Sequence, residues 1–281
     1  MPRPAWARKA RDSMHNIGHW IEANGATLTF AFVPSKIMLY PDKLPATVPA
    51  TLRQACVELA PESILASRLT QQPAGAPYAS YYPLALMRAS RDVESFYPPG
   101  NFHANSRINH LYAQGLLKTL NIDPGSSYSA HEKLANISGD LTSMGFIRTV
   151  SAWTYNYPEY KIRRTRKSPE WVMDFFPKVT DLSVFATAQP ASNRKAVLLS
   201  DSFGAFMAPH LAPGFKRLLH ININSISKAE AEPLISAIMA RFKPDDIIYL
   251  KHDAGLPDHR MHHIGNALSA QLSESSGAAV E

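Results

Sequence analysis

A serine between an apolar segment and a helical pattern is the first candidate for chemistry. Residues 195–209 read KAVLLSDSFGAFMAP, which predicts a strand over 196–199, a tight turn at Ser200-Asp201-Ser202 and a helix after it. A serine in such a turn lies at the carboxyl edge of a sheet and the N-terminus of a helix. There, backbone N–H groups and the helix dipole can stabilise an oxyanion, as acyl transfer through a serine ester requires. The alternative is an ordinary Ser or Asp helix cap.

A nucleophilic serine needs a general base, and His103 is the candidate. The segment 96–105, FYPPGNFHAN, contains two prolines and a glycine, which predict a loop, and a helix over 106–120 follows it. Loops that a rigid scaffold holds commonly carry catalytic residues. Asn101 lies two residues before His103 on the same side of an extended segment, so its side-chain oxygen could hold one imidazole tautomer. The alternative is a histidine that is merely loop surface.

The elements that must position these residues alternate between helix and strand. Downstream of Ala196 the pattern is strand, helix, strand, helix, strand, which predicts a parallel sheet covered by helices on both faces with right-handed crossovers. The expected fold is therefore a three-layer α/β domain. The expected elements are helices over 5–24, 49–59, 84–88 and 228–242, with strands over 27–33, 217–223 and 246–250. Residues 71–83 are expected to be a loop, and 122–193 an insertion or irregular region.

Composition limits the classes of function. The chain has 281 residues, 45% of them hydrophobic, and a formal net charge of +6. That length and composition allow a sizeable core, which we place in one domain over 1–265, followed by a helix end and tail over 266–281. No apolar run approaches the roughly 20 residues of a membrane span, and no signal peptide precedes the first helix.

Cofactors and metals are not expected. Cys56 is the sole cysteine, which excludes an internal disulfide and a cysteine-based metal site. No Gly-rich phosphate loop follows a strand, so no nucleotide cofactor is implied. His259 and His263 could share a helical face beside His262, but no carboxylate or cysteine completes a metal site. The basic cluster over 161–167 is expected to be a solvated loop rather than a nucleic-acid site.

Four short motifs, in order, resemble a known family. They are Pro34-Ser35-Lys36 with Tyr40-Pro41 and Leu44-Pro45, then Asn101-Phe102-His103-Ala104, then Gly139-Asp140-Leu141, and Ser200-Asp201-Ser202-Phe203. Together they resemble the SGNH-like sugar O-acetyltransferases, which include the periplasmic alginate O-acetyltransferases of the X and J type and are related to the DHHW proteins. The resemblance covers about residues 15–255.

The resemblance implies a fold and a set of roles. The fold would be a circularly permuted SGNH-hydrolase-like domain with a central parallel sheet. The protein would be periplasmic and would transfer acetyl groups, through a serine acyl-enzyme, to hydroxyls of an alginate-like exopolysaccharide. A membrane acyltransferase would present the acetyl donor. The residues would be Ser202 as nucleophile, His103 as base, Asn101 as the residue that orients it, Asp201 and Ser200 as oxyanion or site support, and Lys36 and Tyr40 as substrate-binding residues.

Several positions depart from the family pattern. Asn101 replaces an Asp, and an amide can orient an imidazole but cannot stabilise an imidazolium as a carboxylate does. In the chymotrypsin-type triad this change lowers kcat about 10⁴-fold. Asp92 or Glu94 could substitute for the missing carboxylate. The other departures are Ala104 for Trp, Ser200 for Gly, His252-Asp253 for Glu-Arg, and the missing upstream Gly-Trp-Leu-Phe segment, which suggests an N-terminally shortened member.

Two other functions fit parts of the sequence. The first is an SGNH-type carbohydrate esterase that uses Ser202 with Asp258 and either His262 or His259. The second is a non-catalytic polysaccharide-binding or assembly protein that keeps the fold but has lost the acid of the triad, for which Asn101 is the argument.

Overall fold

The candidate residues lie on segments that are joined to one central β-sheet. The computed structural model describes residues 4–58, 64–91, 96–97, 102–125, 128, 131–137, 150–173, 175, 181–256 and 259–277. Seven described strands form one sheet in the order β2-β1-β9-β7-β8-β6-β5. Their bounds are Ala79–Tyr81 (β2), Thr27–Val33 (β1), Asp246–His252 (β9), Lys195–Ser200 (β7), Arg217–Asn222 (β8), Leu182–Thr187 (β6) and Ile162–Thr165 (β5).

The middle of the sheet is parallel. Strand β9 pairs in parallel with both β1 and β7, and β7 pairs in parallel with β8, so that Leu198 lies between Ile248 and His220. Strand β9 is buried along its whole length, and β1 and β7 are buried except at their first residue. Strands covered on both faces are expected to be continuous apolar runs rather than alternating ones, and that pattern is what made β1 and β7 predictable from sequence.

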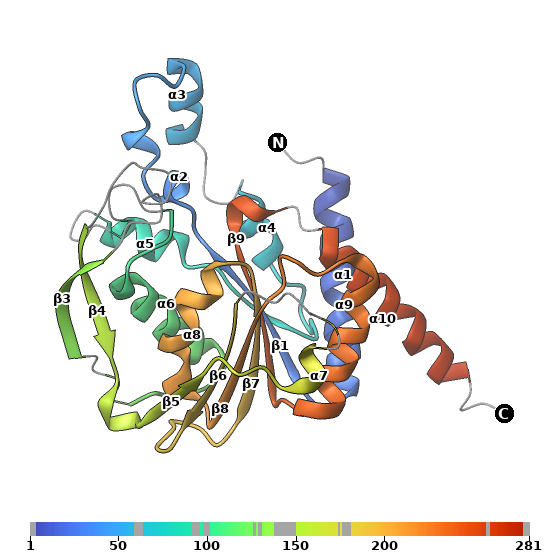
Figure 1. Ribbon diagram of the computed structural model, residues 1–281. Helices are drawn as coiled ribbons and strands as arrows, with labels where there is room; N and C mark the ends of the chain where they lie inside the picture. The colour runs from blue at the N-terminus through green and yellow to red at the C-terminus, as the bar shows by residue number, and fades with distance from the viewer. Residues whose placement is uncertain are drawn as a thin grey trace.

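Helices cover both faces of the sheet. Helices α6 (Ser106–Thr119) and α8 (Phe203–Leu211) lie on one face, and α1 (Pro4–Ala23), α9 (Lys228–Ala237) and α10 (His259–Gly277) lie on the other (Figure 1). One continuous core connects the layers, including Phe30, Leu116, Leu198, Met207 and Leu268. The layered α/β fold predicted from the sequence is therefore confirmed.

The described residues of the region expected to be irregular form four strands. Strands β3 (His131–Ile137) and β4 (Val150–Asn156) form a separate antiparallel pair, and β4 packs beside α6. Strand β6 extends the central sheet antiparallel to β8, and β5 pairs antiparallel with β6. The prediction failed for β3, β4 and β5 because an edge strand and a two-stranded pair have short sequences with little periodicity. Strand β6 is internal and largely buried, and its short apolar run was overlooked.

Two smaller expectations are also wrong. The loop expected over 71–83 contains β2, which pairs in parallel with β1 at the sheet edge. The basic cluster over 161–167 is not a loop throughout, because residues 162–165 form strand β5 on the opposite edge. Arg163 and Arg164 are largely exposed there, and the Arg164 guanidinium donates to the buried Ser183 hydroxyl. Lysine and arginine on an edge strand are common, since they discourage pairing with a second chain.

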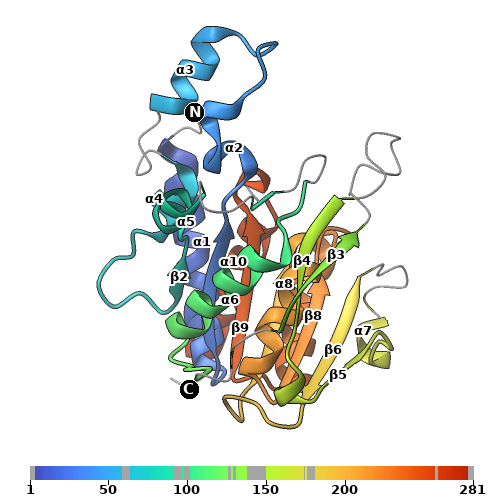
Figure 2. The ribbon, with the colours of Figure 1, turned by 90° about the vertical axis from the view of Figure 1, so that its left-hand side faces the viewer.

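The remaining helices lie mostly at the carboxyl edge of the sheet. Helix α3 has no buried residue and stands away from the body of the molecule at the upper end of both views (Figures 1 and 2). None of the described helices combines the length and apolarity needed to cross a membrane. The remaining bounds are Lys36–Leu39 (α2), Pro41–Lys43 (η1), Ala50–Glu58 (α3), Leu65–Thr70 (α4), Leu84–Ser90 (α5), Pro158–Tyr160 (η5), Glu170–Met173 (α7), Ala212–Gly214 (η6), the π-turn Ile238–Phe242 (η7) and Asp253–Gly255 (η8).

Candidate active site

Ser202 stands in the turn between β7 and α8, as the sequence predicts. It is the N-cap residue of α8, with φ −59° and ψ −22°. Its side chain makes no capping hydrogen bond, so the hydroxyl does not bond to the backbone N–H groups of its own helix. The side chain is half-buried. The simple alternative, a serine whose hydroxyl caps the helix, is therefore wrong for Ser202.

Asp201 links this turn to the neighbouring strand β9 by a hydrogen bond. Its carboxylate accepts a hydrogen bond from the Phe203 N–H at 3.0 Å and another from the His252 N–H at 2.7 Å. Its carbonyl accepts from the Gly204 N–H at 3.1 Å. Among the described residues, the N–H of Ser202 has no hydrogen-bond acceptor, so it is the donor that this turn leaves available to a ligand.

Ser200 lies beneath the turn and is fully buried. Its hydroxyl donates to the Asp201 carbonyl at 2.8 Å and lies 2.9 Å from His220 Nε2. Because the single hydroxyl hydrogen goes to Asp201, His220 must donate from Nε2. Burial lowers the pKa of His220 to about 3, with nearby Arg164 acting in the same direction. A side chain at Gly204 would collide with both Ser200 and His220, so glycine is required where α8 crosses them.

His103 is held immediately before α6. Asn105 is the N-cap of that helix, and its side-chain oxygen accepts from the Ile108 N–H at 3.0 Å. The Asn109 side chain donates to the Ala104 carbonyl at 3.3 Å, which ties the last loop residues to the first turn. His103 Nε2 then lies 3.0 Å from Ser202 Oγ. That is hydrogen-bond reach for proton transfer between a hydroxyl and an imidazole.

Aromatic rings surround this pair. Phe203 lies 4.7 Å from the His103 ring and stacks on His252 at 4.4 Å. Phe206 stacks on His103 at 4.4 Å with an interplanar angle of 28°, while Phe102 meets His103 edge-on at 5.4 Å. Phe203 is buried, but Phe102 is 52% exposed and Phe206 is 42% exposed. Sequence reasoning gave no role to these two exposed rings, although both lie within four residues of a candidate catalytic side chain.

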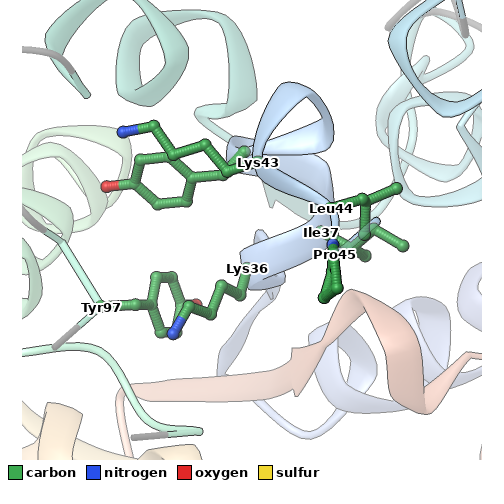
Figure 3. A pocket seen from close by; sticks show the side chains of 7 residues that line it. Lys36, Ile37, Lys43, Leu44, Pro45 and Tyr97 are labelled. Carbon is green, nitrogen blue, oxygen red and sulfur yellow. The ribbon is translucent and has the colours of Figure 1, made fainter. Parts of the chain in front are cut away.

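Lys36 and Tyr40 line a cavity of about 590 Å³ together with Ile37, Lys43, Leu44, Pro45 and Tyr97 (Figure 3). Burial lowers the pKa of Lys36. The Tyr40 hydroxyl accepts a hydrogen bond from the Phe96 N–H at 3.0 Å. This cavity follows the carboxyl end of β1, two strands from the end of β7. Two strand spacings are roughly 10 Å, so the cavity and Ser202 share one edge of the sheet.

His252-Asp253 connects these two parts of the edge. One carboxylate oxygen of Asp253 accepts from the Ser35 N–H at 3.0 Å, and the other accepts from the Tyr82 hydroxyl at 2.6 Å. Burial lowers the pKa of His252, against the opposing effects of Asp253 and Asp201. In the sequence, this pair stood out only because it replaces the Glu-Arg of the family pattern. No signal in the neighbouring residues indicated that Asp253 links the end of β9 to the segment after β1.

Other predicted residues lie elsewhere or outside the described residues. Asn101, Asp92, Glu94, Asp258 and the segment 139–141 lie outside them, as does the side chain of His259. His262 is in the α1–α10 layer, where its Nδ1 is 2.8 Å from Ser13 Oγ. Helix α10 covers the opposite face of the sheet from α8 (Figure 1), so the structure does not bring His262 to Ser202. In the described part of the chain, no three potential ligands cluster around a metal position.

Comparison with known proteins shows that this chain has a known fold. No family model matches the chain, and no curated protein matches it. Among solved structures, it is similar to a DHHW family protein from Eubacterium siraeum, with a TM-score of 0.65, 12% identity, and coverage of 92% of this chain and 88% of the other. The chain has the DHHW-type fold. This confirms the resemblance seen in the sequence at the level of the fold.

Two further similar structures are those of a protein with a sulfonyl adduct and of an O-acetyltransferase domain. PatB1 from Bacillus cereus, solved with a sulfonyl adduct, has a TM-score of 0.66, 15% identity, and coverage of 91% of this chain and 90% of the other. The O-acetyltransferase domain of AlgJ from Pseudomonas putida has a TM-score of 0.56, 12% identity, and coverage of 94% and 91%. An O-acetyltransferase domain is thus among the proteins that share the fold.

Proposed function

We propose that the protein is a serine-dependent O-acetyltransferase that acetylates hydroxyl groups of an exopolysaccharide. The observation that carries the proposal is the 3.0 Å contact between His103 Nε2 and Ser202 Oγ. The two residues are 99 positions apart, and each stands at the start of a helix on the same face of the sheet. The fold that this chain shares with an O-acetyltransferase domain supports acetyl as the group transferred.

The reaction would proceed in two displacement steps. Ser202 Oγ attacks the carbonyl carbon of an acetyl ester while its proton passes to His103 Nε2. His103 then protonates the leaving alcohol, which departs and leaves acetyl-Ser202. In the second step an acceptor hydroxyl gives its proton to His103 and attacks the same carbonyl carbon. The acetyl group moves to the acceptor, and His103 returns the proton to Ser202.

Each tetrahedral intermediate places negative charge on the former carbonyl oxygen. The free N–H of Ser202 and the N-terminal end of the α8 dipole would stabilise that charge. Asp201 and Ser200 would support the site rather than donate to the oxyanion, because their side chains hold the turn itself. Asn101 would orient His103, and an amide in that role gives a slower enzyme than a carboxylate does.

The acceptor would be an alginate-like polymer. The cavity at Lys36 and Tyr40 lies at the same sheet edge as Ser202 and provides two lysines, Lys36 and Lys43, beside aromatic rings. Such a surface favours an anionic sugar chain, since ammonium groups attract carboxylates. The acetyl donor would be presented by a membrane acyltransferase in the periplasm. These assignments rest on the family resemblance together with the shared fold.

Two alternatives remain within the same fold. A carbohydrate esterase would use the same serine and histidine but would pass the acetyl group to water. A non-catalytic binding protein would keep the fold without forming an acetyl-enzyme, and Asn101 is the feature in its favour.

The test is whether Ser202 becomes acetylated and passes the group on. With p-nitrophenyl acetate, we expect a burst of p-nitrophenol and an acetyl group on Ser202 detected by peptide mass spectrometry. Ser202→Ala should abolish the burst, and His103→Ala should slow it by about 10³-fold or more. A sulfonyl fluoride should label Ser202 and block the burst. Failure to acetylate or sulfonylate Ser202 contradicts catalysis, and hydrolysis without transfer to any oligosaccharide favours the esterase.

A further inference from the structure

Two exposed phenylalanines border the reacting groups. Phe206 is 42% exposed and Phe102 is 52% exposed, although both contact the half-buried His103. Large apolar rings left in solvent beside a site are typical of ligand-binding surfaces. Other exposed apolar side chains, such as Leu52 and Leu86, lie on α3 and α5, apart from these reacting groups.

The two rings meet the imidazole differently. Phe206 stacks on its face, with centroids 4.4 Å apart and an angle of 28°. Phe102 approaches edge-on at 5.4 Å and also contacts Phe203 and His252 at 5.6 Å and 5.2 Å. Phe102 is therefore supported from below by buried rings, and its exposed part faces away from them. The two exposed rings flank His103, and His103 Nε2 is the atom from which an acceptor hydroxyl must be activated.

We propose that Phe102 and Phe206 form a stacking platform for the sugar ring that carries the accepting hydroxyl. This proposal rests on the proposed function, since an acceptor is needed only if acetyl-Ser202 forms. A phenyl face is electron-rich and attracts the slightly positive C–H groups that a pyranose ring presents on one face. A sugar whose hydroxyl reaches His103 Nε2 would lie beside these two rings, since both contact the same imidazole.

The platform would also favour transfer over hydrolysis. Phe206 already covers part of one face of His103, and a sugar stacked across the two rings would displace water from the remaining approach. A site closed in this way protects a reactive ester from hydrolysis. The ring faces carry no charge, so they select a sugar ring while the lysines of the neighbouring cavity select its carboxylates.

The experiment measures how acetyl-Ser202 divides between water and a sugar. The acceptor probes are a β-1,4-mannuronate hexamer and cellohexaose, with p-nitrophenyl acetate as the donor. We expect Phe206→Ala to raise the acceptor KM about tenfold, and Phe102→Ala by a smaller factor, with a fall in the ratio of transfer to hydrolysis. Phe206→Trp should restore the ratio because it restores a flat aromatic face. Leu86→Ala, a truncation of an exposed apolar side chain on α5, is the control.

The outcomes separate this inference from the proposed function. If Ser202 is never acetylated, the proposed function fails, and binding of the same hexamers to Ser202→Ala, measured by saturation-transfer NMR, still tests the platform. Loss of that binding in Phe206→Ala supports it. The inference is overturned if acetyl-Ser202 forms while Phe102→Ala and Phe206→Ala match Leu86→Ala, or if neither hexamer accepts acetyl or binds.

Discussion

Single residues fix the turn that carries Ser202. The Asp201 carboxylate uses both oxygens, one toward the first turn of α8 and one toward the end of β9. This places one side chain between the helix that begins after the nucleophile and the strand that lies next to β7. We expect these two hydrogen bonds to hold the turn in the position from which the Ser202 hydroxyl faces His103.

Asp201→Asn tests this role with almost no change in volume. An amide has one oxygen acceptor, so either the Phe203 N–H or the His252 N–H loses its partner. We expect a loss of about 1–3 kcal/mol in the free energy of unfolding and a slower p-nitrophenyl acetate burst. Urea denaturation and stopped-flow absorbance measure the two effects. A variant with native stability and burst rate would show that the turn is held by other contacts.

At the scale of elements, a buried hydroxyl joins the two helices that carry the site. The Tyr157 hydroxyl lies 2.8 Å from His110 Nδ1 on α6 and 2.6 Å from His210 Nδ1 on α8. The ring of His110 also stacks on Tyr128 at 4.7 Å. Tyr157 follows β4, so the antiparallel pair β3–β4 contributes the residue that links α6 to α8.

Tyr157→Phe removes the hydroxyl and keeps the ring. The buried His210 Nδ1 and the half-buried His110 Nδ1 then lose this hydrogen bond, and we expect a destabilisation of about 1–3 kcal/mol. Because His103 precedes α6 and Ser202 precedes α8, looser packing of the two helices should also lower the burst rate while leaving the KM for p-nitrophenyl acetate nearly unchanged. The matched control is Tyr155→Phe, on β4 two residues before Tyr157, which keeps the ring that stacks on His110. Equal effects of the two substitutions would count against a specific link.

At the scale of the whole molecule, two of the buried histidines, His210 and His220, contribute strongly to how stability responds to acid. Burial lowers the pKa of both His210 and His220 to about 3, from an ordinary value of 6.5. In the unfolded chain each would bind a proton below about pH 6.5. Between that pH and about 3 the unfolded state therefore holds more protons than the folded state, so stability is present above this window and is lost as the pH falls through it.

The predicted slope is measurable. Each histidine contributes about 1.4 kcal/mol of unfolding free energy per pH unit inside the window. We expect His210→Gln and His220→Gln each to reduce the slope between pH 6 and 5 by about one proton, and the double variant by about two. Urea titrations at a series of pH values give these slopes. Single and double variants with the slope of the native chain would show that the two imidazoles are charged in the folded protein.

Many of the helices and strands could be predicted because the sequence patterns that indicate them are local. A strand buried on both faces is a run of apolar residues, as in β1 and β7, and the helix expected over 106–120 follows the loop that the prolines and glycine predicted. The turn residues Ser200-Asp201-Ser202 indicated both their own conformation and a candidate nucleophile. By contrast, β3, β4 and β5 were missed because their sequences show little apolar periodicity, and β6 was missed although residues 182–187 form a short apolar run.

The sequence by itself, with the family resemblance, determined which residues are candidates for chemistry: a serine in a strand–helix turn, a histidine on a loop before a helix, and Lys36 after β1. Only the tertiary structure decided that Ser202 and His103 face each other at 3.0 Å, that His262 lies on the opposite face, and that Phe102 and Phe206 stay exposed beside the pair. The reason is physical: propensity and periodicity act over a few residues, whereas the order β1-β9-β7 is set by strand pairing and burial across the whole chain.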